Sequence, residues 1–109
     1  MADDELQKLA HIRQAFATRN YRYTVHAEQQ RIARGILGHD IEAAGASAEL
    51  VEDYPQHRYG PCCLILGHTA SGRPLHLVCS LRVTVDIVTV YEPNPLEWEA
   101  DLKTRRRQE

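Results

Sequence analysis

Residues 62–93 constrain the fold most, because they form the longest predominantly apolar stretch of this 109-residue chain. The stretch divides into three strand-like segments: Cys62–Gly67, Leu75–Leu81 and Val83–Tyr91. Ser71 and Gly72, which lie between the first two segments, are a strong turn signal. We therefore predict a sheet built around a hairpin of these two segments, with Cys62 close to Cys79 across the pair.

Residues 1–20 predict an amphipathic helix at the start of the chain. Asp3 and Asp4 can cap its first turn, and apolar residues recur at the three- and four-residue spacing of one helical face. The side chains that we expect to pack on the rest of the fold are Leu6, Leu9 and Phe16. The next segment, Tyr21–Val25, is aromatic and β-branched, which favours a short strand or an extended segment.

Two further helices and one strand are predicted before the apolar stretch. Thr24 can cap a helix that ends at Gly35. Asp40 can cap a third helix that ends by Gly45, and Ala48–Tyr54 is a candidate strand. The predicted fold class is therefore α+β, with two to three N-terminal helices followed by a mainly antiparallel sheet of about four strands.

The length of the chain indicates one domain, residues 1–109. No apolar run approaches the roughly 20 residues that span a bilayer, and the acidic start MADDEL does not resemble a signal peptide. We therefore expect a cytoplasmic protein with no membrane association. After the sheet, Trp98 is expected to pack back on the body, whereas residues 99–109, which include Arg105–Arg107, are expected to form a charged, solvated tail.

Several kinds of site have no motif in this sequence. The three cysteines lack the CxxC spacing of a zinc site, and no HxxxH or HExxH pair exists. A Gly-rich phosphate loop and a GxSxG motif are also missing. We expect no metal and no cofactor, and we interpret all three cysteines as buried, reduced thiols.

His26 and Arg34 are the first candidate site residues. They are eight residues apart on one predicted helix, so both project to a similar side, with Gln30 between them. An imidazole can transfer a proton and a guanidinium can hold a phosphate, so this pair suits chemistry on a phosphate group. The alternative is structural: His26 caps the helix and Arg34 is a solvated surface residue.

His76 and Tyr91 are the other candidates, on two strands of the predicted sheet. Strict alternation places Ile87, Thr89 and Tyr91 on one face of the last strand, and the valines at 88 and 90 on the other. His76, Thr89 and Tyr91 could then line one polar face. The alternative is a core histidine whose ring is hydrogen-bonded by a neighbouring hydroxyl.

Several short motifs follow one another along most of the chain. They are His26-Ala27, Arg34-Gly35-Ile36, Asp53-Tyr54-Pro55, Gly60-Pro61-Cys62, the stretch 72–78, the stretch 88–93 and Trp98. In this order and spacing, residues 22–98 resemble the DUF4258 family, small bacterial proteins of uncharacterised function. Members of this family usually carry an arginine one turn after the histidine, where this chain has Gln30 followed by Arg31.

The layout of this family is in turn similar to that of RelE/BrnT-type ribonuclease toxins. This resemblance implies a metal-independent endoribonuclease with RNA as its substrate and an antitoxin-like protein as its partner. A base would deprotonate the ribose 2′-hydroxyl, an arginine would stabilise the phosphorane and an acid would protonate the leaving 5′-oxygen. The residues assigned to this chemistry are His26, Arg34, His76 and Tyr91.

The competing hypothesis is a non-catalytic module that binds a protein or a ligand on the same polar face. The formal net charge of -2 favours this second hypothesis, because proteins that act on RNA need positive potential.

Overall fold

The computed structural model describes residues 3–107 and confirms the α+β fold class, with the helices first and most of the sheet after them. The helices are α1 (Asp3–Ala17), α2 (Val25–Ala33) and α3 (Gly38–Ala46). The strands are β1 (Tyr21–Tyr23), β2 (Glu49–Tyr54), β3 (Cys62–His68), β4 (Pro74–Ser80) and β5 (Val85–Tyr91). The outermost parts of the predicted N-terminal helix and C-terminal tail, residues 1–2 and 108–109, lie outside the described residues.

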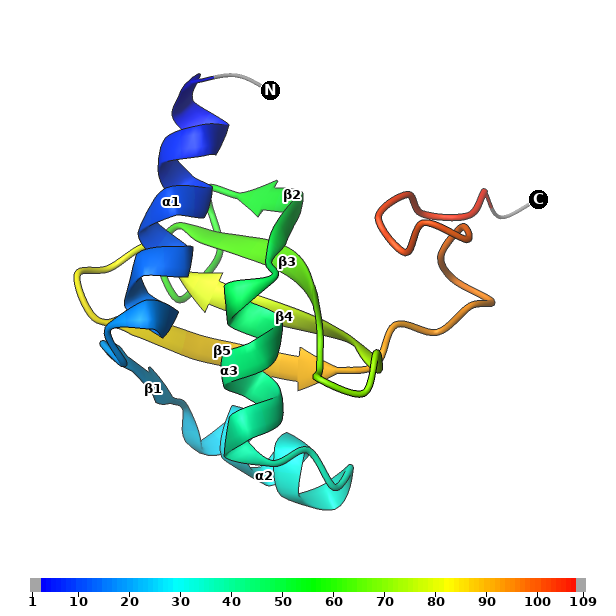
Figure 1. Ribbon diagram of the computed structural model, residues 1–109. Helices are drawn as coiled ribbons and strands as arrows, with labels where there is room; N and C mark the ends of the chain where they lie inside the picture. Colours follow the sequence, from blue (N-terminus) through cyan, green and yellow to red (C-terminus); the bar gives the residue numbers. More distant parts are fainter. Residues whose placement is uncertain (1–2, 108–109) are drawn as a thin grey trace.

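The strands form one sheet in the order β1-β5-β4-β3-β2 (Figure 1). β2, β3, β4 and β5 are antiparallel neighbours, as predicted, whereas β1 pairs with β5 in parallel. The sheet therefore has one more strand than the four predicted. Just after β1, the N–H of Thr24 donates to the carbonyl of Ile87 at 3.0 Å. This parallel pairing holds the start of α2 beside the middle of β5.

The cysteine register differs from the predicted one by a single residue. Cys63, and not Cys62, lies opposite Cys79, while Cys62 pairs with Ser80. A shift of one residue moves a side chain to the other face of a sheet, so Cys62 points away from the other two thiols. All three thiols are buried and free, as predicted. Burial raises the pKa of each thiol, that of Cys63 to about 12, so none is a reactive thiolate.

α1 and α3 cover one face of the sheet (Figure 1). We call the opposite face the outer face. From α1, Leu9 and Phe16 are buried, as predicted, together with Ile12 and Ala15. The prediction for Leu6 is wrong: this side chain is exposed, because the first turn of α1 extends beyond the sheet (Figure 1). No helix within residues 3–107 is long and apolar enough to cross a membrane.

The helix ends were predicted correctly for α2 and partly for α3. Thr24 caps α2 by accepting the N–H of Ala27 at 3.1 Å, and Gly35 follows that helix with φ +64°. Asp40 is not the cap of α3; its carboxylate accepts the N–H of Leu37 from the first turn. α3 also continues through Gly45 to Ala46. Gly45 is needed for packing, since a Cβ there would lie 2.1 Å from the ring of Phe16.

A β-bulge in β5 decides which of its side chains share a face. Thr89 and Ile87 pair with consecutive residues of β4, so Val88 is an extra residue between them. The predicted alternation is therefore wrong for Ile87 and Val88, because a bulge shifts the pattern by one residue. Thr89 and Tyr91 pair with Val78 and His76, so these two share one face with His76, as predicted. Ile87 and Val90 lie in the core under the helices, while Val88 and Tyr91 belong to the cluster on the outer face.

Candidate functional site

His76 and Tyr91 lie opposite each other on β4 and β5, on the outer face. The hydroxyl of Tyr91 is 3.2 Å from Nδ1 of His76, and Nε2 of His76 is 2.7 Å from the carbonyl oxygen of Leu102. A carbonyl only accepts, so Nε2 carries the proton and Nδ1 accepts from Tyr91. His76 is fully buried, and its two ring nitrogens are both engaged. This arrangement matches the structural alternative raised for His76.

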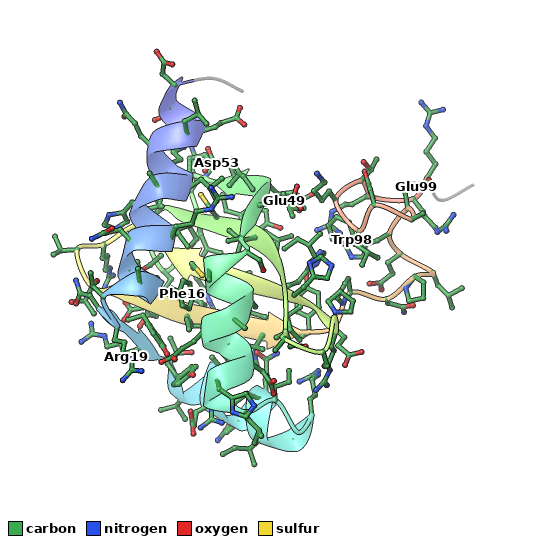
Figure 2. All side chains as sticks on the ribbon, viewed as in Figure 1. Phe16, Arg19, Glu49, Asp53, Trp98 and Glu99 are labelled. Carbon is green, nitrogen blue, oxygen red and sulfur yellow. The ribbon has the colours of Figure 1, made fainter. Side chains whose placement is uncertain are left out.

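The chain that follows β5 covers this pair. Within the C-terminal segment, residues 94–107, Trp98 is 1% exposed and its ring meets His76 edge-on, with the ring centroids 4.6 Å apart. Figure 2 shows Trp98 on the side of this segment that faces the sheet, with Glu99 farther out. Trp98 thus packs on the body, as predicted.

Ion pairs attach the same segment to β2. Arg105 donates to both carboxylate oxygens of Glu52, at 2.8 and 2.9 Å, and its guanidinium lies 4.6 Å from the centroid of Trp98. Lys103 pairs with Glu49 at 2.9 Å. The predicted exposure of Arg105–Arg107 is correct, but Arg105 is held against the sheet and lowers the pKa of Glu52.

The buried His76 predicts a pH dependence of stability. Burial lowers its pKa below the usual 6.5, against smaller opposing effects of the Leu102 carbonyl and Glu52. The unfolded chain therefore binds a proton first, and the free energy of unfolding falls as the pH drops below about 6.5, by at most about 1.4 kcal/mol per pH unit. His76→Gln should lose this slope in urea unfolding between pH 7.5 and 5, and exposed His39→Gln should keep it. An unchanged slope in His76→Gln would contradict the assignment.

A second part of the outer face forms a pocket of about 190 Å³. Its lining comes from the start of α2, the loop between β2 and β3, and β5: Thr24, His26, His57, Arg58, Tyr59, Val88 and Thr89. We call it the histidine pocket. Two imidazoles and one guanidinium line it, and none of these described lining residues carries a carboxylate. A larger hollow, of about 470 Å³ between α1 and α3, contains only Arg13 and Glu42 as charged residues.

Local hydrogen bonds position both histidines. The cap at Thr24 ends β1 and places His26 in the first exposed turn of α2, so His26 itself is not the cap. In the loop, Nδ1 of His57 accepts the N–H of Tyr59 at 3.0 Å, so a neutral His57 carries its proton on Nε2. Arg82 holds Tyr59 in turn, with its guanidinium 5.1 Å from the ring centroid. The bulge in β5 turns Val88 toward the same pocket.

Arg34 does not line the histidine pocket. It follows α2 as an exposed residue, and its carbonyl oxygen accepts an N–H of Arg73 at 3.0 Å. Gln30, between His26 and Arg34, accepts the N–H of Val90 at 2.9 Å through its side-chain oxygen. The side chain of Gln30 therefore hydrogen-bonds a part of β5 that β1 does not pair with. Within residues 3–107, the four predicted site residues form one hydrogen bond with one another, between His76 and Tyr91.

His57, Arg58 and Tyr59 were not among the site residues predicted from the sequence. Their residue types were the available signal, because functional residues concentrate on loops held by a rigid scaffold. No group of three or more His, Cys, Asp or Glu side chains in the described part of the chain is placed to hold a metal ion.

Comparison with known proteins places the chain in a family. Residues 23–92, more than half of the sequence, match the family described as a domain of unknown function, DUF4258. The chain belongs to the DUF4258 family. No curated protein and no solved structure matches it. The matched range of this DUF4258 protein includes His26, His57 and Arg58, and it ends before the C-terminal segment that covers His76.

Proposed function

We propose that this protein is a metal-independent endoribonuclease, of the kind suggested by its resemblance to RelE/BrnT-type toxins, and that it cleaves RNA at the histidine pocket. One observation carries the proposal: His26, His57 and Arg58 line a single pocket. Two imidazoles supply a base and an acid, and a guanidinium holds a phosphate. Arg58 gives the pocket a positive charge, and the lining has no carboxylate, which answers the objection raised by the net charge of -2.

The proposed reaction assigns one role to each residue. The ring of His26 makes no hydrogen bond within residues 3–107. It takes the proton of the ribose 2′-hydroxyl. The 2′-oxygen attacks the adjacent phosphorus and the bond to the 5′-oxygen breaks. His57 enters the reaction as the imidazolium, with protons on both ring nitrogens, gives its Nε2 proton to that leaving oxygen and becomes neutral. Arg58 stabilises the negative charge of the phosphorane. The products are a 2′,3′-cyclic phosphate and a 5′-hydroxyl.

Three of the sequence-predicted site residues have other positions in this proposal. Arg34, His76 and Tyr91 have no role in the proposed reaction, and their catalytic roles stay untested predictions. Arg34 does not line the histidine pocket, and the C-terminal segment covers His76 and Tyr91. The antitoxin-like partner belongs to the same proposal. Val25 and Ile32 are exposed apolar residues on one side of α2, which such a protein would bury.

Replacing either pocket histidine should abolish most of the cleavage. We expect the purified protein to cleave a labelled, single-stranded RNA of mixed sequence in the presence of EDTA. His26→Ala and His57→Ala should each lower the rate by about 100-fold or more, the usual contribution of a general acid or base. His39→Ala, which removes an exposed histidine on α3, is the matched control and should cleave like the wild type.

A second candidate function is the non-catalytic binding module. The observation in its favour is the burial of His76, which leaves no histidine exposed on β4. Wild-type protein that binds the RNA but cleaves it no faster than the variant His26→Ala/His57→Ala would favour this module. Cleavage with 2′,3′-cyclic phosphate ends, lost in both single variants, would favour the enzyme.

A further inference from the structure

Asp86 is a buried carboxylate on the outer face, beside the histidine pocket. It is 1% exposed, and its Oδ1 accepts the Nε–H of Arg22 at 2.5 Å. Its Oδ2 has no hydrogen-bond partner among the described residues and lies 3.7 Å from a guanidinium nitrogen of Arg82. A charge in this position is costly unless opposite charges accompany it. Arg22 and Arg82 therefore provide the compensation.

The two arginines keep most of their own donors for another partner. Their side chains are 65% and 57% exposed. Each guanidinium has five N–H donors. Within residues 3–107, Arg22 uses Nε for Asp86, and Arg82 donates one N–H to the carbonyl of Tyr59. Two cations share one carboxylate, so the cluster has a net positive charge and free donors in the geometry that suits a phosphate.

This cluster adjoins the histidine pocket on two strands. Arg22 precedes Thr24 by two residues, and Asp86 precedes Val88 by two residues, and both later residues line the pocket. Side chains two residues apart on a strand share a face and lie about 6.6 Å apart. The cluster and the pocket are therefore neighbours on the outer face. Tyr59, which lines the pocket, also carries the guanidinium of Arg82 on its ring.

We propose that Arg22 and Arg82, positioned by Asp86, form a second phosphate-binding subsite, and that the ligand spanning it and the histidine pocket is single-stranded RNA. The inference takes RNA as the ligand from the proposed function, but it makes a claim about binding and not about cleavage. The stacked pair of Tyr59 and Arg82 connects the two sites, because Tyr59 lines the histidine pocket and Arg82 belongs to the second subsite, and it offers a surface for an unpaired base. Bases inside a duplex are already stacked, and a mononucleotide has no second phosphodiester. The substrate class is therefore an RNA strand.

The test measures binding separately from cleavage. The probe is a fluorescent 2′-O-methyl-oligouridylate, which cannot be cleaved because its attacking hydroxyl is blocked, and the readout is fluorescence anisotropy over a series of salt concentrations. Arg82→Gln should weaken binding about tenfold. It should also lower the salt slope by about 0.7 for the lost phosphate contact. Arg19→Gln, an exposed arginine that follows α1, makes the same charge change and should bind like the wild type.

Arg22 needs a second design, because Arg22→Gln alone leaves Asp86 buried with a weaker partner and can prevent folding. The double variant Arg22→Gln/Asp86→Asn removes both members of the pair and leaves the net charge unchanged. It should lose affinity to a similar extent as Arg82→Gln, with its fold checked by circular dichroism. A loss in this variant does not come from a change of total charge, which is constant; it comes from the missing Arg22 guanidinium and from the loss of the carboxylate that positions Arg82.

The outcomes separate this inference from the proposed cleavage. If Arg82→Gln and the double variant bind like the wild type, the subsite is wrong, even where His26→Ala abolishes cleavage. If both lose affinity while wild-type protein cleaves no RNA, the subsite holds and the proposed reaction is wrong. A duplex RNA that binds as tightly as the single strand, or an equal loss of affinity in Arg19→Gln, overturns the inference.

Discussion

Gly67→Ala should lower the free energy of unfolding by about 3 kcal/mol or more, the upper end of the cost of overpacking a core. Gly67 lies in β3, directly under α3, and a Cβ at this position would be 2.0 Å from the carbonyl oxygen of Ala44. The obstacle is backbone, which cannot rotate away as a side chain would. α3 would have to move off the sheet, and the core beneath it would lose its packing. Urea unfolding monitored by circular dichroism measures the effect.

Two further variants make this prediction specific. Gly38→Ala also adds a methyl group, but the nearest atom to the new Cβ is the Tyr23 hydroxyl oxygen at 3.9 Å, so its stability should stay within about 0.5 kcal/mol of the wild type. Adding Ala44→Gly to Gly67→Ala should restore little, because the clash involves the backbone of residue 44. A Gly67→Ala protein within about 1 kcal/mol of the wild type would show that α3 is farther from β3 than this structure has it.

Features set by neighbouring residues could be predicted from the sequence. The cap at Thr24 and the left-handed Gly35 depend on a few adjacent residues, and both were predicted correctly. The strands of the apolar stretch follow from their composition. The cysteine register and the extra Val88 could not be predicted. Apolar residues occupy both faces of these strands, so a shift of one residue leaves the sequence pattern equally compatible with a strand, and packing against the helices selects the register.

The candidate site shows the same division between local and long-range effects. His76 and Tyr91 were assigned to strands correctly, and their contact follows once β4 and β5 pair. His26 and His57 are 31 positions apart and belong to a helix and a loop. They line one pocket because β1 pairs in parallel with β5 and the β2–β3 loop lies against the same face. Nothing in the local sequence of either histidine indicates the other.

Trp98→Ala should cost about 3 to 5 kcal/mol of unfolding free energy, the usual range for truncating a buried tryptophan. Trp98 joins three parts of the structure: it packs in the outer-face cluster with Leu64, meets the ring of His76, and carries the guanidinium of Arg105. Leu96→Ala is the matched control in the same segment. Leu96 is 83% exposed, so its truncation should change stability by no more than about 0.5 kcal/mol.

The same variant decides whether the C-terminal segment is a structural part or a removable cover. Loss of Trp98 should admit water to His76 and return its pKa toward 6.5, because burial is the main cause of its lowered value. Proton NMR of the His76 ring measures this shift. RNA cleavage per folded molecule should stay unchanged, since the proposed reaction uses the histidine pocket. A rise in cleavage that disappears in Trp98→Ala/His76→Gln would instead assign the catalytic role to His76, and the segment would then be an inhibitory cover.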